Sequence, residues 1–85
     1  MISAGQIHDL IQEAIPEATV VVQDPMNDGT HLEAVVVSST FVGQTRMEQH
    51  KEVYRALGNA FDGPLHALRL TTLTPEQARA RNLTP

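Results

Sequence analysis

The sequence predicts a two-layer α+β domain in which helices pack on one face of a small three-stranded sheet. The length of 85 residues suits one domain with one modest core, which we place at residues 1–85. Apolar residues recur with helical spacing in some segments, whereas other segments are short and β-branched. Turn-forming residues separate these segments, and the resulting order is helix, strand, strand, helix, strand, helix.

The first expected helix covers Ser3–Ala14. Ser3-Ala4-Gly5-Gln6 fits a capping box, in which the Ser and Gln side chains bind free backbone N–H groups. Apolar residues then follow at steps of three and four, and they form one helix face: Ile7, Leu10, Ile11, Ala14 and Ile15. Pro16 ends the helix.

Two strands are expected next. Thr19–Gln23 is short and β-branched, which is typical of a strand. Asp24–Thr30 contains Asp, Pro, Asn and Gly and predicts a loop. His31–Ser38 is the second strand, and the two strands are expected to pair as an antiparallel hairpin.

The second helix is expected to begin at the capping box Thr45–Glu48, after a turn. A stripe at steps of three and four is predicted to face the core, and it consists of Met47, His50, Tyr54, Leu57 and Phe61. The third strand is expected over Leu65–Leu73. A third capping box, Thr74–Gln77, with Pro75 at the favoured first position, opens a short polar helix.

Composition excludes several classes of protein. The chain has no cysteine, which rules out disulfides, all-cysteine zinc sites and self-contained thiolate clusters. No apolar run approaches the roughly 18 residues of a membrane span, so we expect no membrane insertion and a cytoplasmic protein. The net charge of −4 and the 4% of aromatic residues both count against nucleic-acid binding.

Catalytic motifs are not evident. The sequence has no Gly-rich phosphate loop and no serine in a nucleophile elbow, so we do not expect an enzyme. Arg46, Lys51 and Arg55 recur at about one helical turn on the second helix. Two interpretations are open for them, a solvated helix face and a set of phosphate contacts.

The four histidines are the candidates for metal chemistry. His8 and His50 lie on the two long helices, where a solvated or hydrogen-bonded residue is the simpler interpretation. His31 begins the second strand and His66 begins the third. A helix joins these strands, and such crossovers make strands parallel, so both histidines are expected at the same sheet edge. They are either unrelated strand-end polar residues or a two-histidine site that needs further ligands from outside the chain.

Two stretches of the chain resemble the BolA family. They are AVVVSSTFVGQTRMEQHKEVYRAL (34–57) and LHALRLTTLTPEQ (65–77). The resemblance implies a class II KH-like αββαβ fold and a monothiol glutaredoxin as partner. It also implies a [2Fe-2S] cluster shared with that glutaredoxin and glutathione, which supply thiolates. His66 of the His-Ala motif is the implied first ligand, and His31 is the only loop candidate for the second.

The resemblance implies a role in iron–sulfur trafficking or in iron or redox regulation. Neutral imidazoles on one iron would raise the potential of such a cluster, as in Rieske centres. The alternative is a nucleic-acid-binding transcriptional regulator that uses the KH-like fold, with Arg46, Lys51 and Arg55 as contacts. The Gly-x-x-Gly loop by which KH domains bind RNA is missing, and Gln49 stands where many members have Arg. A homodimer of the free chain stays open.

Overall fold

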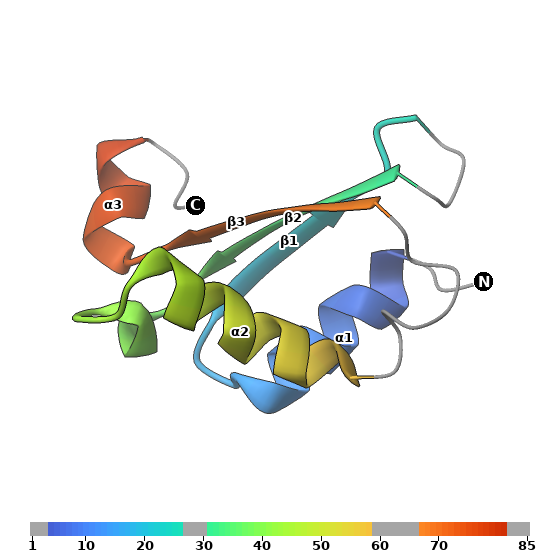
Figure 1. Ribbon diagram of the computed structural model, residues 1–85. Helices are drawn as coiled ribbons and strands as arrows, with labels where there is room; N and C mark the ends of the chain where they lie inside the picture. Colours follow the sequence, from blue (N-terminus) through green and yellow to red (C-terminus); the bar gives the residue numbers. More distant parts are fainter. Residues whose placement is uncertain (1–3, 27–30, 59–66, 82–85) are drawn as a thin grey trace.

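A computed structural model describes residues 4–26, 31–58 and 67–81 (Figure 1). The elements follow the predicted order, with one added 3-10 turn: α1 (Ala4–Ala14), β1 (Thr19–Gln23), β2 (His31–Val37), η1 (Ser39–Phe41), α2 (Arg46–Leu57), β3 (Ala67–Leu73) and α3 (Pro75–Ala80). Ser3 of the first predicted capping box lies outside the described residues. No helix within these ranges is long and apolar enough to cross a membrane.

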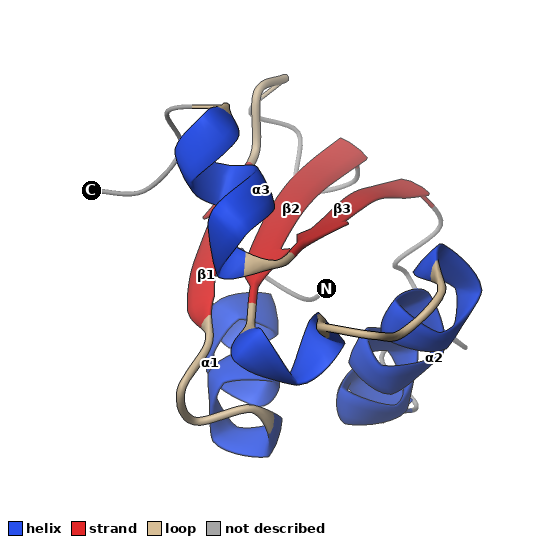
Figure 2. Ribbon diagram, turned by 90° about the vertical axis from the view of Figure 1, so that its left-hand side faces the viewer, coloured by secondary structure: helices blue, strands red, loops and turns tan. Residues whose placement is uncertain are grey.

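The three strands form one sheet in the order β1-β2-β3 (Figures 1 and 2). β1 and β2 pair antiparallel, which confirms the predicted hairpin, and Thr19 lies opposite Val37. β2 and β3 pair parallel, which confirms the inference from the helical crossover. The parallel register begins at the pair His31–Ala67 and ends at Val37–Leu73.

The main core lies between the sheet and the two longer helices, α1 and α2, which cover one face of it (Figure 1). Alternate residues of β2 point to that face, and Leu32 and Val36 are buried there. They meet apolar residues of both helices and of the 3-10 turn, namely Ile7, Ile11, Phe41, Val53 and Leu57. The α+β class and the three-stranded sheet are as predicted.

The short helix α3 packs at the end of the sheet where β3 ends (Figure 1). Its buried Ala78 forms a second, smaller cluster with Val37 and Leu73. Val37 follows the core residue Val36, and adjacent strand residues point to opposite faces. Therefore α3 covers one end of the face that α1 and α2 leave open.

The predicted core stripe of α2 is wrong for two of its members. Met47 is 68% exposed and Tyr54 is 39% exposed. The buried face consists instead of Gln49, Val53 and Leu57. Only Leu57 belongs to both faces, and Phe61 lies outside the described residues.

Gln49 is buried, and its side-chain amide makes three hydrogen bonds. Its Nε2 donates to the carbonyl oxygen of Phe41 at 3.1 Å and to that of Gln44 at 3.2 Å. Its Oε1 accepts a hydrogen bond of 2.7 Å from the Thr72 hydroxyl of β3. A polar side chain is tolerated in a core when its hydrogen bonds are satisfied in this way. These bonds fix the rotation of α2 about its axis.

Both later capping boxes are confirmed. Thr45 Oγ1 accepts from the Glu48 backbone N–H at 3.2 Å, and the Glu48 carboxylate accepts from the Thr45 N–H at 2.8 Å. These bonds, first that of the Thr45 backbone, lower the pKa of Glu48. Thr74 and Gln77 make the same reciprocal pair at the start of α3. Local sequence therefore sets both helix starts.

Candidate functional site at the start of β2 and β3

His31 occupies the first position of β2, directly opposite Ala67, the first residue of β3. The parallel pairing brings the starts of the two strands to one end of the sheet. His66 precedes Ala67 in the sequence but lies outside the described residues. The same-edge arrangement of the two strands is thus confirmed, whereas the proximity of the two histidine side chains stays a prediction.

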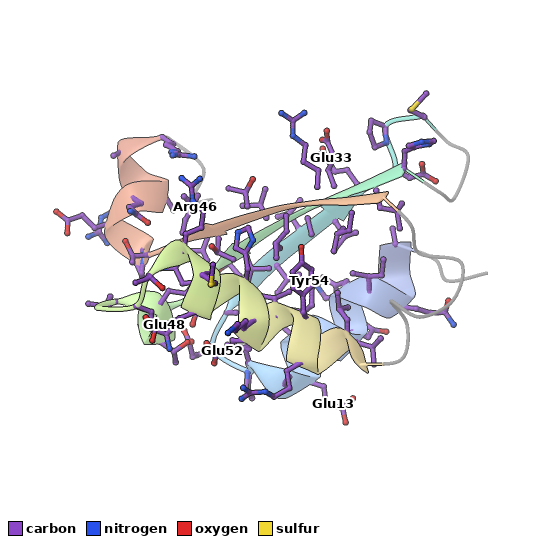
Figure 3. All side chains as sticks on the ribbon, viewed as in Figure 1. Glu13, Glu33, Arg46, Glu48, Glu52 and Tyr54 are labelled. Atoms are coloured by element: carbon purple, nitrogen blue, oxygen red, sulfur yellow. The ribbon has the colours of Figure 1, made fainter. Side chains whose placement is uncertain are left out.

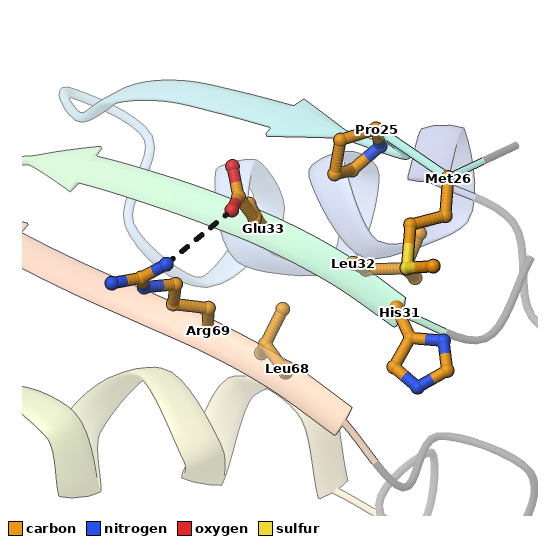
Figure 4. A pocket seen from close by; sticks show the side chains of 7 residues that line it. All are labelled: Pro25, Met26, His31, Leu32, Glu33, Leu68 and Arg69. Atoms are coloured by element: carbon orange, nitrogen blue, oxygen red, sulfur yellow. Dashed lines mark ion pairs between the residues drawn. The ribbon is translucent and has the colours of Figure 1, made fainter.

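The His31 side chain is exposed and borders a shallow hollow of roughly 430 Å³ (Figure 4). Pro25, Met26, His31, Leu32, Glu33, Leu68 and Arg69 line this hollow. Most of these side chains are apolar, and Met26 is 64% exposed. In Figure 4 the imidazole projects at the end of the sheet where β2 and β3 begin. The imidazole therefore lies beside a solvent-exposed apolar surface.

An ion pair borders the same hollow (Figure 4). Arg69 Nη1 lies 3.9 Å from Glu33 Oε1, between cross-strand neighbours of β2 and β3. The Arg69 side chain is 83% exposed, so the pair adds little to stability. The two opposite charges lie beside the apolar surface and partly offset each other.

The described ranges hold no group of three or more His, Asp or Glu side chains that could bind a metal ion. The full sequence contains no cysteine either. A structural zinc ion takes four protein ligands, and a [2Fe-2S] cluster takes four ligands besides its sulfides, two on each iron. Among the described residues, the start of β2 and β3 therefore has too few donors for a metal centre of its own.

The other two histidines lie on helices, in agreement with the simpler interpretation. The His8 ring nitrogen is 3.1 Å from the Asp9 carboxylate, and its side chain is 41% exposed. His50 packs edge-on against Tyr54, with ring centroids 6.2 Å apart. Partial burial, and then the charge of Arg46, lower the pKa of His50.

The structure separates Arg46 from Arg55 in the predicted basic stripe of α2. Lys51 and Arg55 line a hollow together with Glu48 and Glu52, whose negative charges oppose phosphate binding. Arg46 lines two other hollows, one with His50 and Lys51 and one with His50 and Arg81. The sequence interpretation missed Arg81, and its only signal was a basic residue at the end of the last helix.

A family model described as BolA-like protein matches residues 6–77 of the chain. The chain belongs to the BolA family. Among solved structures, a BolA protein homologue from Coxiella burnetii superposes with a TM-score of 0.78 and is 38% identical. The match covers 93% of this BolA-family chain and 99% of that one, which confirms both the predicted family and the predicted fold class.

Two curated relatives with BolA in their names are longer than this chain. BolA-like protein 1 from Mus musculus is 40% identical over 55 residues, which cover 65% of this chain and 40% of the relative. A relative from Haemophilus influenzae, named DNA-binding transcriptional regulator BolA, is 33% identical over 55 residues, or 65% of this chain and 53% of that protein. The matched region thus spans about half or less of these two relatives. Neither name refers to an enzymatic activity.

Proposed function

We propose that this BolA-family chain is an interaction protein that pairs with a monothiol glutaredoxin. In the pair, the chain would supply His66 and His31 as ligands to a [2Fe-2S] cluster, and the glutaredoxin and glutathione would supply thiolates. The heterocomplex would serve iron–sulfur trafficking or iron and redox regulation. The observation that carries the proposal is the parallel pairing of His31 with Ala67, the residue that follows His66.

The register supports the assignment of these two histidines rather than the other two. His31 starts β2, and the residue after His66 lies opposite it. His8 and His50 lie on α1 and α2 and take no part in this strand pairing. The register therefore favours His31 and His66 as the pair of ligands from distant parts of the sequence.

The chemistry of the donors fits a shared cluster. Without cysteine, this chain cannot hold an iron–sulfur cluster by thiolates alone. Neutral imidazole is an established substitute for thiolate on one iron of a [2Fe-2S] cluster, and it makes the cluster less negative. Thiolates from a partner would complete the ligand set.

The surface beside His31 supports docking of a partner. Met26, Pro25 and Leu68 expose apolar groups in the same hollow as the imidazole. Burial of apolar surface is the main favourable term in protein association. A partner seated here would also exclude water from the ligands.

The test is to titrate the protein into a cluster-loaded monothiol glutaredoxin and to record visible absorption and circular dichroism. We expect a one-to-one complex with a spectrum that differs from that of the glutaredoxin alone. His66→Ala should abolish the difference, and His31→Ala should reduce it. Matched controls are His8→Ala and His50→Ala, which remove imidazoles from the helices and should leave the spectrum unchanged.

Two results would contradict the proposal in different ways. A complex whose spectrum is the same with His66→Ala would show that the partner is right and the ligand wrong. A failure of the wild-type chain to bind the glutaredoxin at all would remove the partner as well. The binding itself is measured by size-exclusion chromatography, independently of the spectrum.

A second candidate is the binding of DNA by a transcriptional regulator, which the name of the Haemophilus influenzae relative favours. Arg46 is the strongest basic candidate, because neither of the two hollows that it lines contains a carboxylate among the described residues. Fluorescence anisotropy with labelled DNA at about 50 mM salt is the test, since phosphate-driven affinity is high there. Binding that Arg46→Gln weakens and added salt abolishes would support this function.

A further inference from the structure

A small polar hollow lies between α2, the second half of β3 and the residue that caps the end of α3. Arg46 and His50 of α2, Thr71 and Thr72 of β3, and Arg81 line it. Its volume of roughly 200 Å³ corresponds to about six or seven water molecules at ~30 Å³ each. That space suits a small polyatomic ion with a few waters.

Arg46 and Arg81 face the hollow from two different elements, α2 and the end of α3. Within the described ranges, neither Arg46 nor Arg81 forms an ion pair with a carboxylate, whereas Arg69 pairs with Glu33. Figure 3 shows Arg46 extending from α2 toward β3 and α3. Two of the six Lys and Arg residues of an acidic chain thus face one space.

β3, the strand beside the hollow, adds uncharged hydrogen-bond donors. Within the described part of the chain, β3 pairs only with β2, so its other edge leaves backbone N–H groups that the sheet does not use. Guanidinium groups and backbone N–H groups together are typical ligands of phosphate oxygens. The hollow therefore offers donors of both kinds and, among its lining residues, no carboxylate.

We propose that this hollow binds one phosphate-type oxyanion, with Arg46 and Arg81 as its charged ligands and the outer edge of β3 as its floor. The site is separate from the start of β2 and β3 and does not depend on the proposed glutaredoxin complex. Its ligand is either free phosphate or a phosphate group of a nucleic-acid backbone. The shared chemistry is a tetrahedral anion held by two guanidinium groups.

The test is an NMR titration of the full chain with inorganic phosphate, in which chloride keeps the ionic strength low and constant. We expect saturable shifts of the amides of residues 70–73. Arg46→Gln and Arg81→Gln should each weaken binding by about tenfold, as expected for loss of a hydrogen bond to a charged group. Matched controls are Arg55→Gln on α2 and Arg79→Gln on α3, which should bind phosphate like the wild type.

The pKa of His50 provides a second readout in the same titration. The charged or titratable groups that surround it in its two hollows are Arg46, Lys51, Tyr54 and Arg81. Arg46 contributes to the lowered pKa of His50. A bound anion offsets that positive charge, so saturation with phosphate should raise the pKa of the imidazole. Shifts that grow linearly without saturation, or an Arg46→Gln variant that binds like Arg55→Gln, would overturn the proposal.

A second titration separates the two sources of phosphate. A short single-stranded oligonucleotide is added in place of inorganic phosphate. Tighter binding than that of phosphate, with the same dependence on Arg46 and Arg81, would identify a nucleic-acid backbone as the ligand. Binding of phosphate alone would identify the free ion. Binding of neither would refute the site.

Discussion

The Thr72 hydroxyl donates a buried hydrogen bond of 2.7 Å to Gln49 Oε1, and this bond ties the first turn of α2 to β3. Gln49 is only 7% exposed, and its Nε2 satisfies two further backbone carbonyls. Deleting the amide would remove the hydrogen bonds to the Thr72 hydroxyl and the Gln44 carbonyl, and one of the two bonds to the Phe41 carbonyl. The pair is therefore a strong candidate for a measurable energetic coupling.

We expect Gln49→Ala to lower the free energy of unfolding by about 1–3 kcal/mol, because buried polar groups lose their partners. Thr72→Val removes the other half of the hydrogen bond. A double-mutant cycle by urea denaturation should give a coupling energy of about 1 kcal/mol between the two positions. Strictly additive effects would show that the bond contributes nothing beyond the single side chains.

The reassigned buried face of α2 predicts unequal effects of two truncations. Val53 is fully buried, and Val53→Ala should lower the free energy of unfolding by about 2 kcal/mol through lost burial and a residual cavity. Met47→Ala is the matched control, since Met47 is 68% exposed. Its effect should stay within about 0.5 kcal/mol. Thermal or urea unfolding of both variants tests this. A larger loss of stability for Met47→Ala than for Val53→Ala would instead support the core stripe predicted from the sequence.

Glu17 predicts an acid-sensitive contribution to stability. A hydrogen bond from the Ser38 hydroxyl, followed by smaller bonds from Ser39 and Thr40, holds the pKa of the Glu17 carboxyl below its ordinary value of 4.5. A carboxyl whose pKa is lower in the folded than in the unfolded state stabilises the fold above the unfolded pKa. This contribution is lost as the pH falls through the folded pKa.

We therefore expect the difference in unfolding free energy between the wild type and Glu17→Gln to be constant near neutral pH. It should shrink as the pH falls below about 4.5. The carboxyl is largely exposed, so the difference should be under about 1 kcal/mol. Urea denaturation at a series of pH values measures it. In a Ser38→Ala background the pH dependence should weaken, and an unchanged dependence would mean that Ser38 is not its main cause.

The proposed ligand role of His66 predicts a change in redox potential. His66→Cys would replace a neutral imidazole by a thiolate and make the shared cluster more negative. We expect the reduction potential of the complex with the glutaredoxin to fall by an amount on the order of 100 mV. A redox titration followed by circular dichroism measures it, with His8→Cys as the control. An unchanged potential with His66→Cys would exclude this residue as a ligand.

Local signals in the sequence predicted much of the fold. The capping boxes at Thr45 and Thr74 depend on side chains three residues apart, so they could be recognised without tertiary information. The crossover rule predicted that β2 and β3 run parallel, and hence that His31 and the residue opposite it, Ala67, begin the two strands at one edge.

Features that depend on long-range partners could not be predicted. Gln49 is buried because of Thr72 and two backbone carbonyls, and no local pattern shows these partners. The exposed Met47 and Tyr54 have the spacing of a core face, but α2 packs against the sheet with its neighbouring face. Arg46 and Arg81 share one hollow only because β3 and α3 bring the chain back past α2.

The parallel pair of β2 and β3 also has a consequence for the order of folding. His31 and Ala67 are far apart in the sequence, and the whole of α2 lies between them. Proteins that depend on non-local strand pairing fold more slowly than those with local contacts. We therefore expect the two strand starts to come together after the local structure of α2 has formed. A nascent or partly folded chain would contain the same histidines, but its β2 and β3 would not be paired. A partner that recognises the paired strand starts would therefore distinguish the folded protein from a partly folded one.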